Sequence, residues 1–466
     1  MKKFSQRSWF RFLSMAILCG LLLPAWAAPK RVLVVTVTKG FRHSSIPTAE
    51  KVLGELGEKS GAFTVDYVRN DAEMAEKMTL ANLEKYDGVI FANTTGDLPL
   101  PDKTGFLKWI ESGKGFIGMH SATDTFRGHK PLDAYTLMIG GEFLTHDAQV
   151  GVDCLNQDHQ HPATKHLGDK FSIFDEIYIL NGFERAKVHG LLTLDKHPNS
   201  GAPGDYPIAW CKNYGKGRVF YTSLGHREDV WDPAWKDQKG NRQNSPEIAQ
   251  AYQQHILNGI KWALGLEKGD ATPQSTKAVL SDKEAREGFK PLFNGVDLTG
   301  WKLRNPSGQP SWSAQNGMLV NTIGKNEHGT DLVSEEQFRD FTIRYEYMIP
   351  KGSNSGLYLR GRHEVQIFDD FGTGETKMGG NGAIYSVKPA SQNVSRKPGE
   401  WQQGEATIIG NKVTVTLNGV KIHDNVEVNK ATGGELDGNL DQPGPIMLQG
   451  DHGAIAFRNV RIKKLK

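Results

Sequence analysis

The pattern of apolar and polar residues divides the chain into two parts. In the first part, unbroken apolar runs of strand length occur at residues 31–36, 88–92 and 115–119, and segments able to form helices, such as 47–56 and 102–112, lie between them. Fully buried parallel strands are apolar on both faces, so this alternation predicts a doubly wound α/β domain.

A long amphipathic helix is expected to close this domain. Ser245 provides an N-cap and Pro246 suits the first turn, and an apolar stripe follows at Ile248, Tyr252, Ile256 and Ile260. Residues 267–287 are polar and contain Gly, Pro and Ser before a short helix near 282–287. This composition predicts a linker over 267–287, which separates a domain at 28–266 from another at 288–466.

The second part has the period of β-structure. Apolar residues alternate with polar ones over residues 341–349, and Asn-Gly pairs at 316–317 and 418–419 separate short apolar runs. Such pairs favour two-residue hairpin turns, and many short strands with little helix predict a β-sandwich.

One predicted hairpin, at residues 355–369, has polar residues on one face. A period of two places Leu357, Leu359, Val365 and Ile367 toward a core. The opposite face then receives four polar or aromatic residues, which are Tyr358, Arg360, Glu364 and Gln366. Two interpretations stay open at this point, a ligand-binding patch and a surface sheet face with an arginine–glutamate pair.

Residues 1–27 resemble an export signal. Basic residues precede an apolar run at 12–23, and Ala25 and Ala27 are small residues at a cleavage position. We therefore expect a periplasmic or secreted protein without stable membrane insertion, since no later run is long enough for a transmembrane helix. After cleavage two cysteines remain, Cys154 and Cys211, and they either pair or stay as buried thiols.

Charge adds little to this picture. The formal net charge is +3, and basic residues are scattered along the 466-residue chain. We expect no nucleic-acid partner, because such binding needs clustered basic residues. The sequence leaves the oligomeric state open.

Polar residues follow the predicted buried strands of the first domain. Residues 40–44, 93–97 and 120–124 each come directly after a strand, and open α/β sheets bind ligands at this edge. Eleven of the fifteen histidines lie between His43 and His255. His120 ends a strand abruptly before small residues, in the manner of a nucleophile elbow with an imidazole at its tip.

Several motifs of the first domain resemble the trehalose-utilisation ThuA-like family. They are GFIGMHSATDTF, GGEFLTHD, FSIFDEIYIL and RVFYTSLGH. The resemblance implies a flavodoxin-like, class I glutamine-amidotransferase-like fold with His120 at the usual cysteine position, and a context of 3-keto sugars. Glutaminase chemistry is excluded, because an imidazole cannot replace the thiolate. The candidate acid, base or metal-binding residues are His43, His120, His146, Glu176 and His226, and a divalent metal ion is one of the alternatives.

The second domain resembles the 3-keto-disaccharide hydrolase domain. The matching segments are PLFNG with DLTGW at residues 291–301, the hairpin at 354–369, and 444–460. This resemblance implies a concanavalin-like jelly roll whose concave sheet binds sugar, and enzymes that cleave 3-keto-glycosides by net hydrolysis or by 1,2-elimination and hydration. Gly450 and Asp451 depart from the spacing expected before His452.

The chemistry of such a substrate assigns roles to side chains. A carbonyl at carbon 3 acidifies the proton on carbon 2, so cleavage needs a base, an oxyanion stabiliser and an acid. We expect the catalytic residues to be Glu364 as base, Arg360 as stabiliser, His452 or Asp369 as acid, and His120 in the first domain. We expect the substrate-binding residues to be Tyr358, Gln366, Tyr385, Gln449, His43, His146, Glu176 and His226.

The predicted function is that of an exported enzyme that cleaves 3-keto-glycosides. In a first alternative, the ThuA-like domain is the only enzyme and the sandwich is a carbohydrate-binding module. In a second, the two domains act in sequence, one cleaving the substrate and the other processing the released sugar. For Asp369, Asp370 and Asp451, a turn-stabilising role is an equal alternative.

Overall fold

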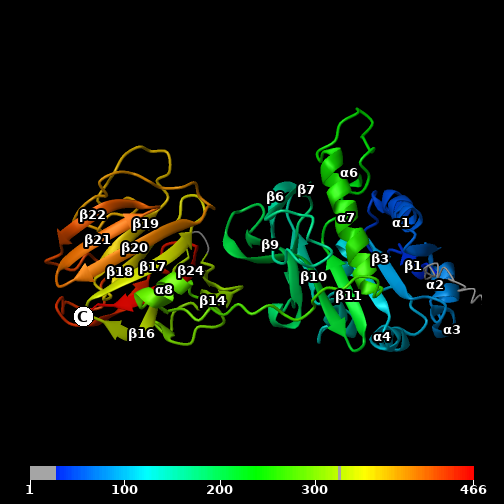
Figure 1. Cartoon of the computed structure of the whole chain (residues 1–466), viewed down its shortest axis with the longest axis horizontal. Coiled ribbons are helices and arrows are strands. Elements are labelled where there is room, and N and C mark those ends of the chain that lie inside the picture. The colour runs from blue at the N-terminus through cyan, green and yellow to red at the C-terminus, as the bar shows by residue number, and fades with distance from the viewer. Residues whose placement is uncertain (1–27, 324–326, 466) are drawn as a thin grey trace, which may run out of the picture.

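A computed structural model describes residues 28–323 and 327–465 as two domains side by side, joined by a linker (Figure 1). The expected export signal at residues 1–27 lies outside the described residues. Among the described residues, no helix is both long and apolar enough to cross a membrane.

The first domain is built on a mixed sheet of nine strands. Five neighbouring strands are parallel, in the order β2 (Phe63–Val68), β1 (Lys30–Val35), β3 (Gly88–Ala92), β4 (Gly115–Met119) and β11 (Gly217–Thr222). The predicted runs at 88–92 and 115–119 coincide with β3 and β4, because buried parallel strands need apolar residues on both faces.

The expected doubly wound parallel sheet is present in only part of the sheet, which is mixed. Beyond β11 the sheet continues with four antiparallel strands, which are β10 (Pro203–Tyr214), β9 (His189–Lys196), β6 (Val150–Asn156) and β7 (Lys170–Asp175). The tight connection between β10 and β11 explains the change of direction, since Gly215 has a φ of +58° there and so short a link can join only antiparallel strands.

Helices cover both faces of the sheet. Those singled out in the sequence are α1 (Ile46–Ser60), α4 (Lys103–Glu111) and α7 (Pro246–Ala263), and α7 packs on β4 and β11 (Figure 1). Ser245 caps α7 by accepting a hydrogen bond from the Ile248 N–H, as predicted. The shorter helices are α2 (Asp71–Lys77), α3 (Leu80–Leu83), α5 (Ala134–Ile139), α6 (Glu228–Trp231), η1 (His120–Asp124) and η2 (Arg185–Lys187). A separate pair, β5 (Glu142–His146) and β8 (Tyr178–Asn181), forms a small two-stranded sheet.

The linker ends in α8 (Asp282–Glu287), whose start is fixed by a capping box between Ser281 and Glu284. Cys211 lies in β10 and its Sγ is 3.5 Å from the Asp270 carbonyl oxygen of the linker. Cys154 and Cys211 are both buried and both free thiols, which decides between the two states left open by the sequence.

The second domain is all β and its described pairs are antiparallel. One sheet contains β12 (Lys290–Pro291), β14 (Trp312–Gln315), β15 (Met318–Asn321), β17 (Phe341–Met348), β20 (Gln402–Ile409), β21 (Lys412–Leu417), β22 (Val420–Glu427) and β24 (Ile455–Lys464). The other contains β13 (Trp301–Leu303), β16 (Leu332–Phe338), β23 (Gly444–Leu448), β18 (Asn354–Leu359) and β19 (His363–Phe368). Both predicted Asn-Gly turns have positive φ at the two positions, as a type I′ hairpin requires.

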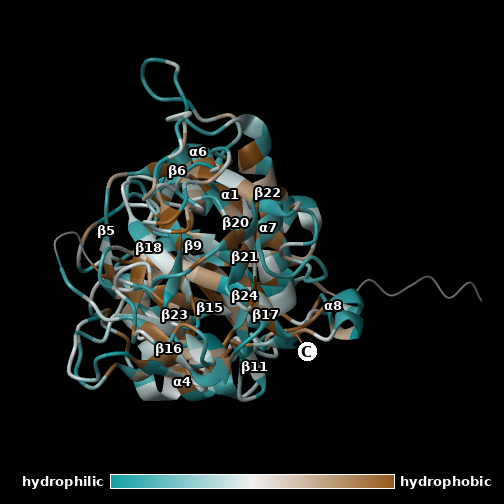
Figure 2. Cartoon of the chain, turned by 90° about the vertical axis from the view of Figure 1, so that its left-hand side faces the viewer, coloured by the Kyte–Doolittle hydropathy of each residue, from teal (hydrophilic) through white to brown (hydrophobic). Residues whose placement is uncertain are grey.

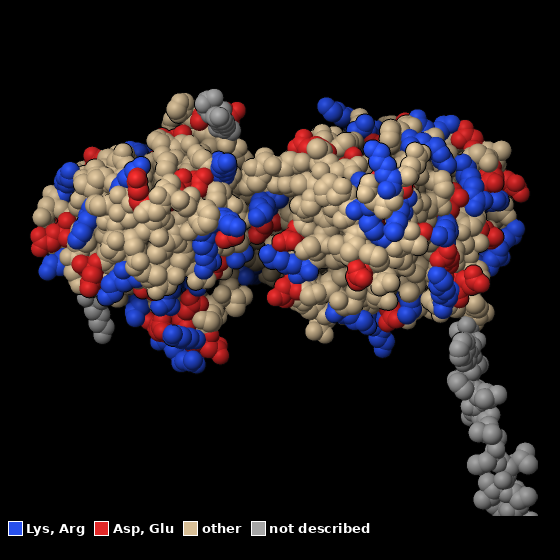
Figure 3. Space-filling view, turned by 90° about the horizontal axis from the view of Figure 1, so that it is seen from above, with Lys and Arg blue, Asp and Glu red and all other residues tan. Residues whose placement is uncertain are grey.

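The surface carries charges of both signs. Lysine and arginine are interspersed with aspartate and glutamate on the face shown in Figure 3. The loops are largely hydrophilic, while brown, hydrophobic residues recur along the strands (Figure 2).

The apolar side chains of Leu357, Leu359, Val365 and Ile367 lie in the core of the second domain, as the pleat predicts.

Candidate functional site

Four ligand-type side chains meet at the carboxyl edge of the first domain. His43 follows β1, His120 follows β4, Glu176 follows β7 and His226 follows β11. The strands β1, β4 and β11 run parallel and end at the same edge, which collects the three histidines, while Glu176 comes from the end of β7 in the antiparallel part of the sheet. We call this group the histidine site.

The polar atoms of the histidine site are in direct contact. His120 Nε2 lies 3.1 Å from His43 Nε2 and 3.3 Å from His226 Nδ1. Glu176 Oε2 lies 3.1 Å from His226 Nδ1 and 3.6 Å from His120 Nε2. The Tyr178 hydroxyl is 3.2 Å from the same His120 nitrogen. The sequence therefore identified a real cluster.

His120 occupies a special backbone position. Its φ is +48°, which is left-handed and uncommon for a residue with a side chain, so the abrupt turn expected at the end of β4 is present. Its Nδ1 lies 2.8 Å from the Ser223 carbonyl oxygen, which can only accept a hydrogen bond. In neutral His120 the proton is therefore on Nδ1, and the lone pair of Nε2 faces the cluster.

Burial sets the charge of the histidine site. Loss of hydration lowers the pKa of His43 to about 4 and lowers the pKa of His120 strongly, with further lowering by the neighbouring histidines. For His226, burial opposes the charged form, but the hydrogen bond and charge of Glu176 outweigh it and raise the pKa. At neutral pH, His43 and His120 thus offer unprotonated nitrogens.

A pocket of about 430 Å³ opens onto these groups. Polar and aromatic side chains line it beside the cluster, among them Phe41, Asp124, Arg127, Phe143 and Tyr178. His146 is half-exposed in this pocket, opposite Tyr178 in the β5–β8 pair, and its Nδ1 is 3.2 Å from Glu176 Oε1. All five predicted residues of this domain therefore line or adjoin one cavity.

The second candidate site is the polar face of the β18–β19 hairpin. Tyr358 is paired with Glu364, and Gly356 with Gln366, so the side chains of Tyr358, Glu364 and Gln366 share the face turned away from the core. We call this face, together with Asp331 and Gln449, the glutamate site.

Glu364 is a perturbed carboxyl group. Only 3% of the residue is exposed, and burial together with the charges of Asp331 and Asp451 raises the pKa of Glu364 to about 7. A hydrogen bond with Tyr358 acts in the opposite direction but is outweighed. The carboxyl of Glu364 thus titrates near neutrality, as a general base requires.

The expectation that Arg360 shares this face is wrong. β18 ends at Leu359, and Arg360 lies in the turn with a φ of +55°, where the alternation of the pleat stops. Its guanidinium, in a residue that is 1% exposed, donates hydrogen bonds to Asp340 Oδ1 and to the Arg339 and Leu440 carbonyl oxygens. Arg360 therefore ties together three chain segments.

Two further predicted residues have local partners. Asp369 Oδ2 accepts a hydrogen bond of 2.7 Å from the Gly352 N–H, which is the turn-stabilising arrangement. Gln366 Oε1 accepts one of 3.1 Å from the Ile367 N–H. Tyr385 is 38% exposed, and its N–H donates to the Glu364 carbonyl oxygen, so the backbone of Tyr385 runs beside β19.

The remaining predicted residues lie near the end of β23. The Gln449 side-chain amide is 3.4 Å from the Tyr358 hydroxyl oxygen. His452, with 47% of its side chain exposed, contacts Asp451 through an Nδ1–Oδ1 distance of 2.5 Å. The charge of Asp451 raises the pKa of Glu364, so the Asp451–His452 pair lies close enough to the glutamate site to influence it.

Sequence reasoning missed two parts of the glutamate site. Asp331 is buried, accepts hydrogen bonds from the Gly450 N–H at 3.0 Å and from Arg304 at 3.1 Å, and has a pKa raised by burial. Gly356 leaves room for Glu364, because a Cβ at this position would collide with the carboxyl group. The available signal for Asp331 was a carboxylate directly before the apolar pair Leu332-Val333, which begins the strand at 332–338.

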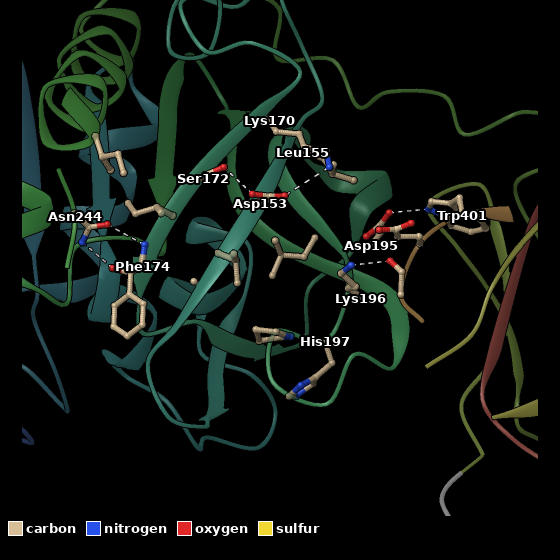
Figure 4. Close-up of a pocket in the computed structure, with 18 of the residues that line it drawn as sticks. Asp153, Leu155, Lys170, Ser172, Phe174, Asp195, Lys196, His197, Asn244 and Trp401 are labelled. Carbon is tan, nitrogen blue, oxygen red and sulfur yellow. Dashed lines mark hydrogen bonds and ion pairs between the residues drawn. The ribbon is translucent and has the colours of Figure 1, made fainter. Parts of the chain in front are cut away.

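A cavity of about 910 Å³ lies elsewhere, between the domains (Figure 4). Its walls include β6, β7 and β9 of the first domain and residues near Trp401 of the second. The Trp401 indole N–H donates to Asp195 Oδ2 at 2.8 Å, and Lys196 Nζ donates to the Gly399 carbonyl oxygen at 2.7 Å. None of the site residues predicted from the sequence lines this cavity.

Family comparisons cover both domains. Residues 31–263 match the ThuA family, described as trehalose utilisation. Residues 288–463 match the family described as 3-keto-alpha-glucoside-1,2-lyase-like domain.

Individual relatives are distant. A 3-keto-disaccharide hydrolase of Bacteroides thetaiotaomicron is 22% identical, with 26% of this chain and 53% of that protein aligned, so the chain spans about half the length of this curated relative. Among solved structures, a ThuA-like protein of Parabacteroides merdae is 21% identical over 53% of this chain and 94% of its own, with a TM-score of 0.40. A structure described as a glycosyl hydrolase of Parabacteroides distasonis is 25% identical over 40% of this chain and 99% of its own, with a TM-score of 0.35.

The order of the two matches agrees with the order of the two domains. The chain therefore belongs to the ThuA family through residues 31–263 and carries a 3-keto-alpha-glucoside-1,2-lyase-like domain at residues 288–463.

Proposed function

We propose that the chain is a carbohydrate-active enzyme that cleaves 3-keto-glycosides in its second domain, with Glu364 as the general base. The observation that carries the proposal is the buried Glu364 carboxyl with a pKa of about 7. A carboxylate of that basicity can remove a proton that an adjacent ketone has acidified. The family match of residues 288–463 and the name of the Bacteroides relative support the substrate class.

The proposed reaction is a 1,2-elimination. Glu364 takes the proton from carbon 2, the electron pair of the C–H bond forms the enolate of the 3-ketone, and the enolate expels the oxygen at carbon 1 with its bonding pair. A proton donor then protonates this oxygen, and addition of water across the new double bond makes the net reaction a hydrolysis.

Other side chains at the glutamate site fit the supporting roles. Burial and the neighbouring Glu364 raise the pKa of Tyr358 far above its ordinary value, so its O–H keeps its proton and donates it in a hydrogen bond that orients the Glu364 carboxylate. Gln449 adds an N–H donor beside it. His452, exposed and paired with Asp451, is the better placed proton donor, since Asp369 is engaged by Gly352. Arg360 has no part in this mechanism.

The finer structural and cellular assignments belong to the same proposal. The order β2-β1-β3-β4-β11 of the parallel strands supports a flavodoxin-like first domain. Two antiparallel sheets around one core support a jelly roll for the second. We further propose export through residues 1–27 to the periplasm or the medium.

A second candidate function keeps the first domain as the only enzyme and makes the sandwich a carbohydrate-binding module. The histidine site favours it, because a pocket of 430 Å³ with unprotonated imidazoles is equipped for acid–base chemistry. The two candidates differ in which side chain controls cleavage.

The test compares the full chain with the Glu364→Gln and His120→Ala variants on a 3-keto-glucoside. Catalysis by the sandwich predicts that Glu364→Gln lowers kcat by about 10²–10⁴-fold, the usual contribution of a general base. The binding-module alternative predicts a raised KM with unchanged kcat for Glu364→Gln, and loss of cleavage in His120→Ala. Unaltered kcat in Glu364→Gln would therefore overturn the proposal.

A further inference from the structure

We propose that His43, His120, Glu176 and His226 bind one divalent transition-metal ion, with Zn²⁺ as the best match. The inference concerns the first domain and stands independently of the reaction proposed for the second.

The donor set fits a borderline-soft ion. Three imidazole nitrogens and one carboxylate oxygen lie within 4.8 Å of one another, one atom from each residue. Imidazole favours Zn²⁺, Fe²⁺, Ni²⁺ and Cu²⁺, whereas Mg²⁺ and Ca²⁺ prefer oxygen ligands alone. The predominance of nitrogen therefore excludes the hard cations.

The spacing of the donors fits a tetrahedron of zinc size. Zinc–ligand bonds of about 2.0–2.1 Å separate two ligands of a tetrahedron by about 3.3–3.4 Å. Four of the six separations lie near this value: His120 Nε2 is 3.1 Å from His43 Nε2 and 3.3 Å from His226 Nδ1, and Glu176 Oε2 is 3.1 Å from His226 Nδ1 and 3.6 Å from His120 Nε2. The other two, from His43 to His226 and to Glu176, are within 4.8 Å, so an ion would draw His43 toward these two ligands.

The ring nitrogens of the cluster point at one another. With its proton on Nδ1, His120 presents an unprotonated Nε2, and His43 Nε2 lies 3.1 Å away. His226 Nδ1 also lies 3.3 Å from His120 Nε2, so ring nitrogens of three histidines lie together inside the cluster. One cation between these atoms would satisfy all of them at once.

The outer nitrogens and oxygens are held by protein groups. His120 Nδ1 is bound to the Ser223 carbonyl oxygen, Ser121 Oγ is 3.4 Å from His43 Nδ1, and His146 Nδ1 is 3.2 Å from Glu176 Oε1. Hydrogen bonds to the outer atoms of ligand side chains orient those ligands and commonly contribute about 10–100-fold to metal affinity.

A second histidine group in the same domain shows the contrast. His189 uses Nδ1 for the Thr272 carbonyl oxygen at 2.6 Å and Nε2 for Asp158 at 2.9 Å. Its neighbour His161 accepts a hydrogen bond from the Ala163 N–H and has Cys211 Sγ 3.7 Å from its other nitrogen. The ring nitrogens of His189 and His161 all contact other protein groups, one of them the Thr272 carbonyl oxygen of the linker. This second group is therefore structural and is not proposed to bind an ion.

The experiment uses the untagged full chain, stripped with a chelator and dialysed. Zn²⁺ binding is measured by titration calorimetry, and Co²⁺ serves as a spectroscopic probe of the ligand geometry. We expect about one equivalent of Zn²⁺, and intense visible d–d bands of tetrahedral Co²⁺ that Zn²⁺ abolishes.

The variants are His120→Ala and the isosteric Glu176→Gln, with His159→Ala as a control at a half-exposed histidine outside the cluster. Circular dichroism verifies that each variant is folded. We expect both cluster variants to bind Zn²⁺ at least about tenfold more weakly and His159→Ala to bind as the parent does. Absence of Zn²⁺ binding in the parent, or equal affinity in the folded Glu176→Gln variant and the parent, overturns the proposal. Cleavage of a 3-keto-glucoside by the metal-free chain is scored separately, so failure of one proposal leaves the other intact.

Discussion

Replacement of Glu364 by glutamine should make the stability of the protein less sensitive to pH. The carboxyl has a pKa of about 7 in the folded chain against an ordinary 4.5. Folding therefore favours its protonated form. The stability that it contributes is present below pH 4.5 and is lost as the pH rises through 7, because ionisation is then easier in the unfolded chain.

The size of the effect follows from this difference. At about 1.4 kcal/mol for each tenfold change, the step from 4.5 to about 7 corresponds to about 3 kcal/mol. Almost all of it should be lost between pH 4 and pH 8. Glutamine cannot ionise, so the Glu364→Gln variant should gain about 3 kcal/mol relative to the parent over this range, on top of any pH-independent offset.

The assay is denaturant unfolding of the full chain and the variant at several pH values, with the two proteins compared at each pH. This difference cancels the titration of other groups that the substitution leaves unchanged. A difference in unfolding free energy that stays constant within about 0.5 kcal/mol from pH 4 to pH 8 would show that Glu364 has an ordinary pKa, and the argument for a base at this position would fail.

Three further predictions concern Gly356 at the glutamate site, Arg360 in the neighbouring turn and the contact between the domains. If Glu364 is the base, Gly356→Ala should lower the rate of 3-keto-glucoside cleavage about 10²-fold, because the new Cβ would displace the Glu364 carboxyl, and an undiminished rate would show that the space at Gly356 is not needed. Arg360→Ala should lower the free energy of unfolding by about 3–5 kcal/mol, because it leaves the Asp340 carboxylate and two carbonyl oxygens without their donor. The control Arg339→Ala removes an exposed side chain and should cost less than about 0.5 kcal/mol. Similar losses for the two variants in chemical unfolding would contradict the role of Arg360 in joining three chain segments. A double-mutant cycle of Trp401→Phe with Asp195→Ala should give a coupling energy of about 1–3 kcal/mol in the unfolding of the full chain, and a value near zero would mean that this hydrogen bond does not hold the domains together.

The fold was predictable where one physical rule dominates. Buried parallel strands need unbroken apolar runs, so β3 and β4 follow directly from the sequence. The antiparallel extension beyond β11 was missed because β9 and β10 contain buried apolar runs like those of the parallel strands, and an apolar run does not give the direction of a strand.

The candidate sites were also predictable only in part. His43 and His120 meet because strand ends gather at one edge, which a strand assignment already implies. Arg360 was misplaced because the pleat was extended by one residue into the turn, and a positive φ at a non-glycine residue leaves little trace in a sequence. Asp331 reaches the glutamate site through contacts with Gly450, more than a hundred residues away along the chain, and local patterns do not contain such contacts.

The dependence of cleavage on the 3-carbonyl tests the central claim most directly. The full chain is incubated with a 3-keto-glucoside and with the unoxidised glucoside of the same aglycone, and the products are identified by mass spectrometry. The proposed elimination predicts release of the aglycone from the 3-keto-glucoside alone, because only the ketone acidifies the proton that Glu364 removes. Cleavage of both glucosides at similar rates would contradict it and would indicate an ordinary two-carboxylate glycosidase.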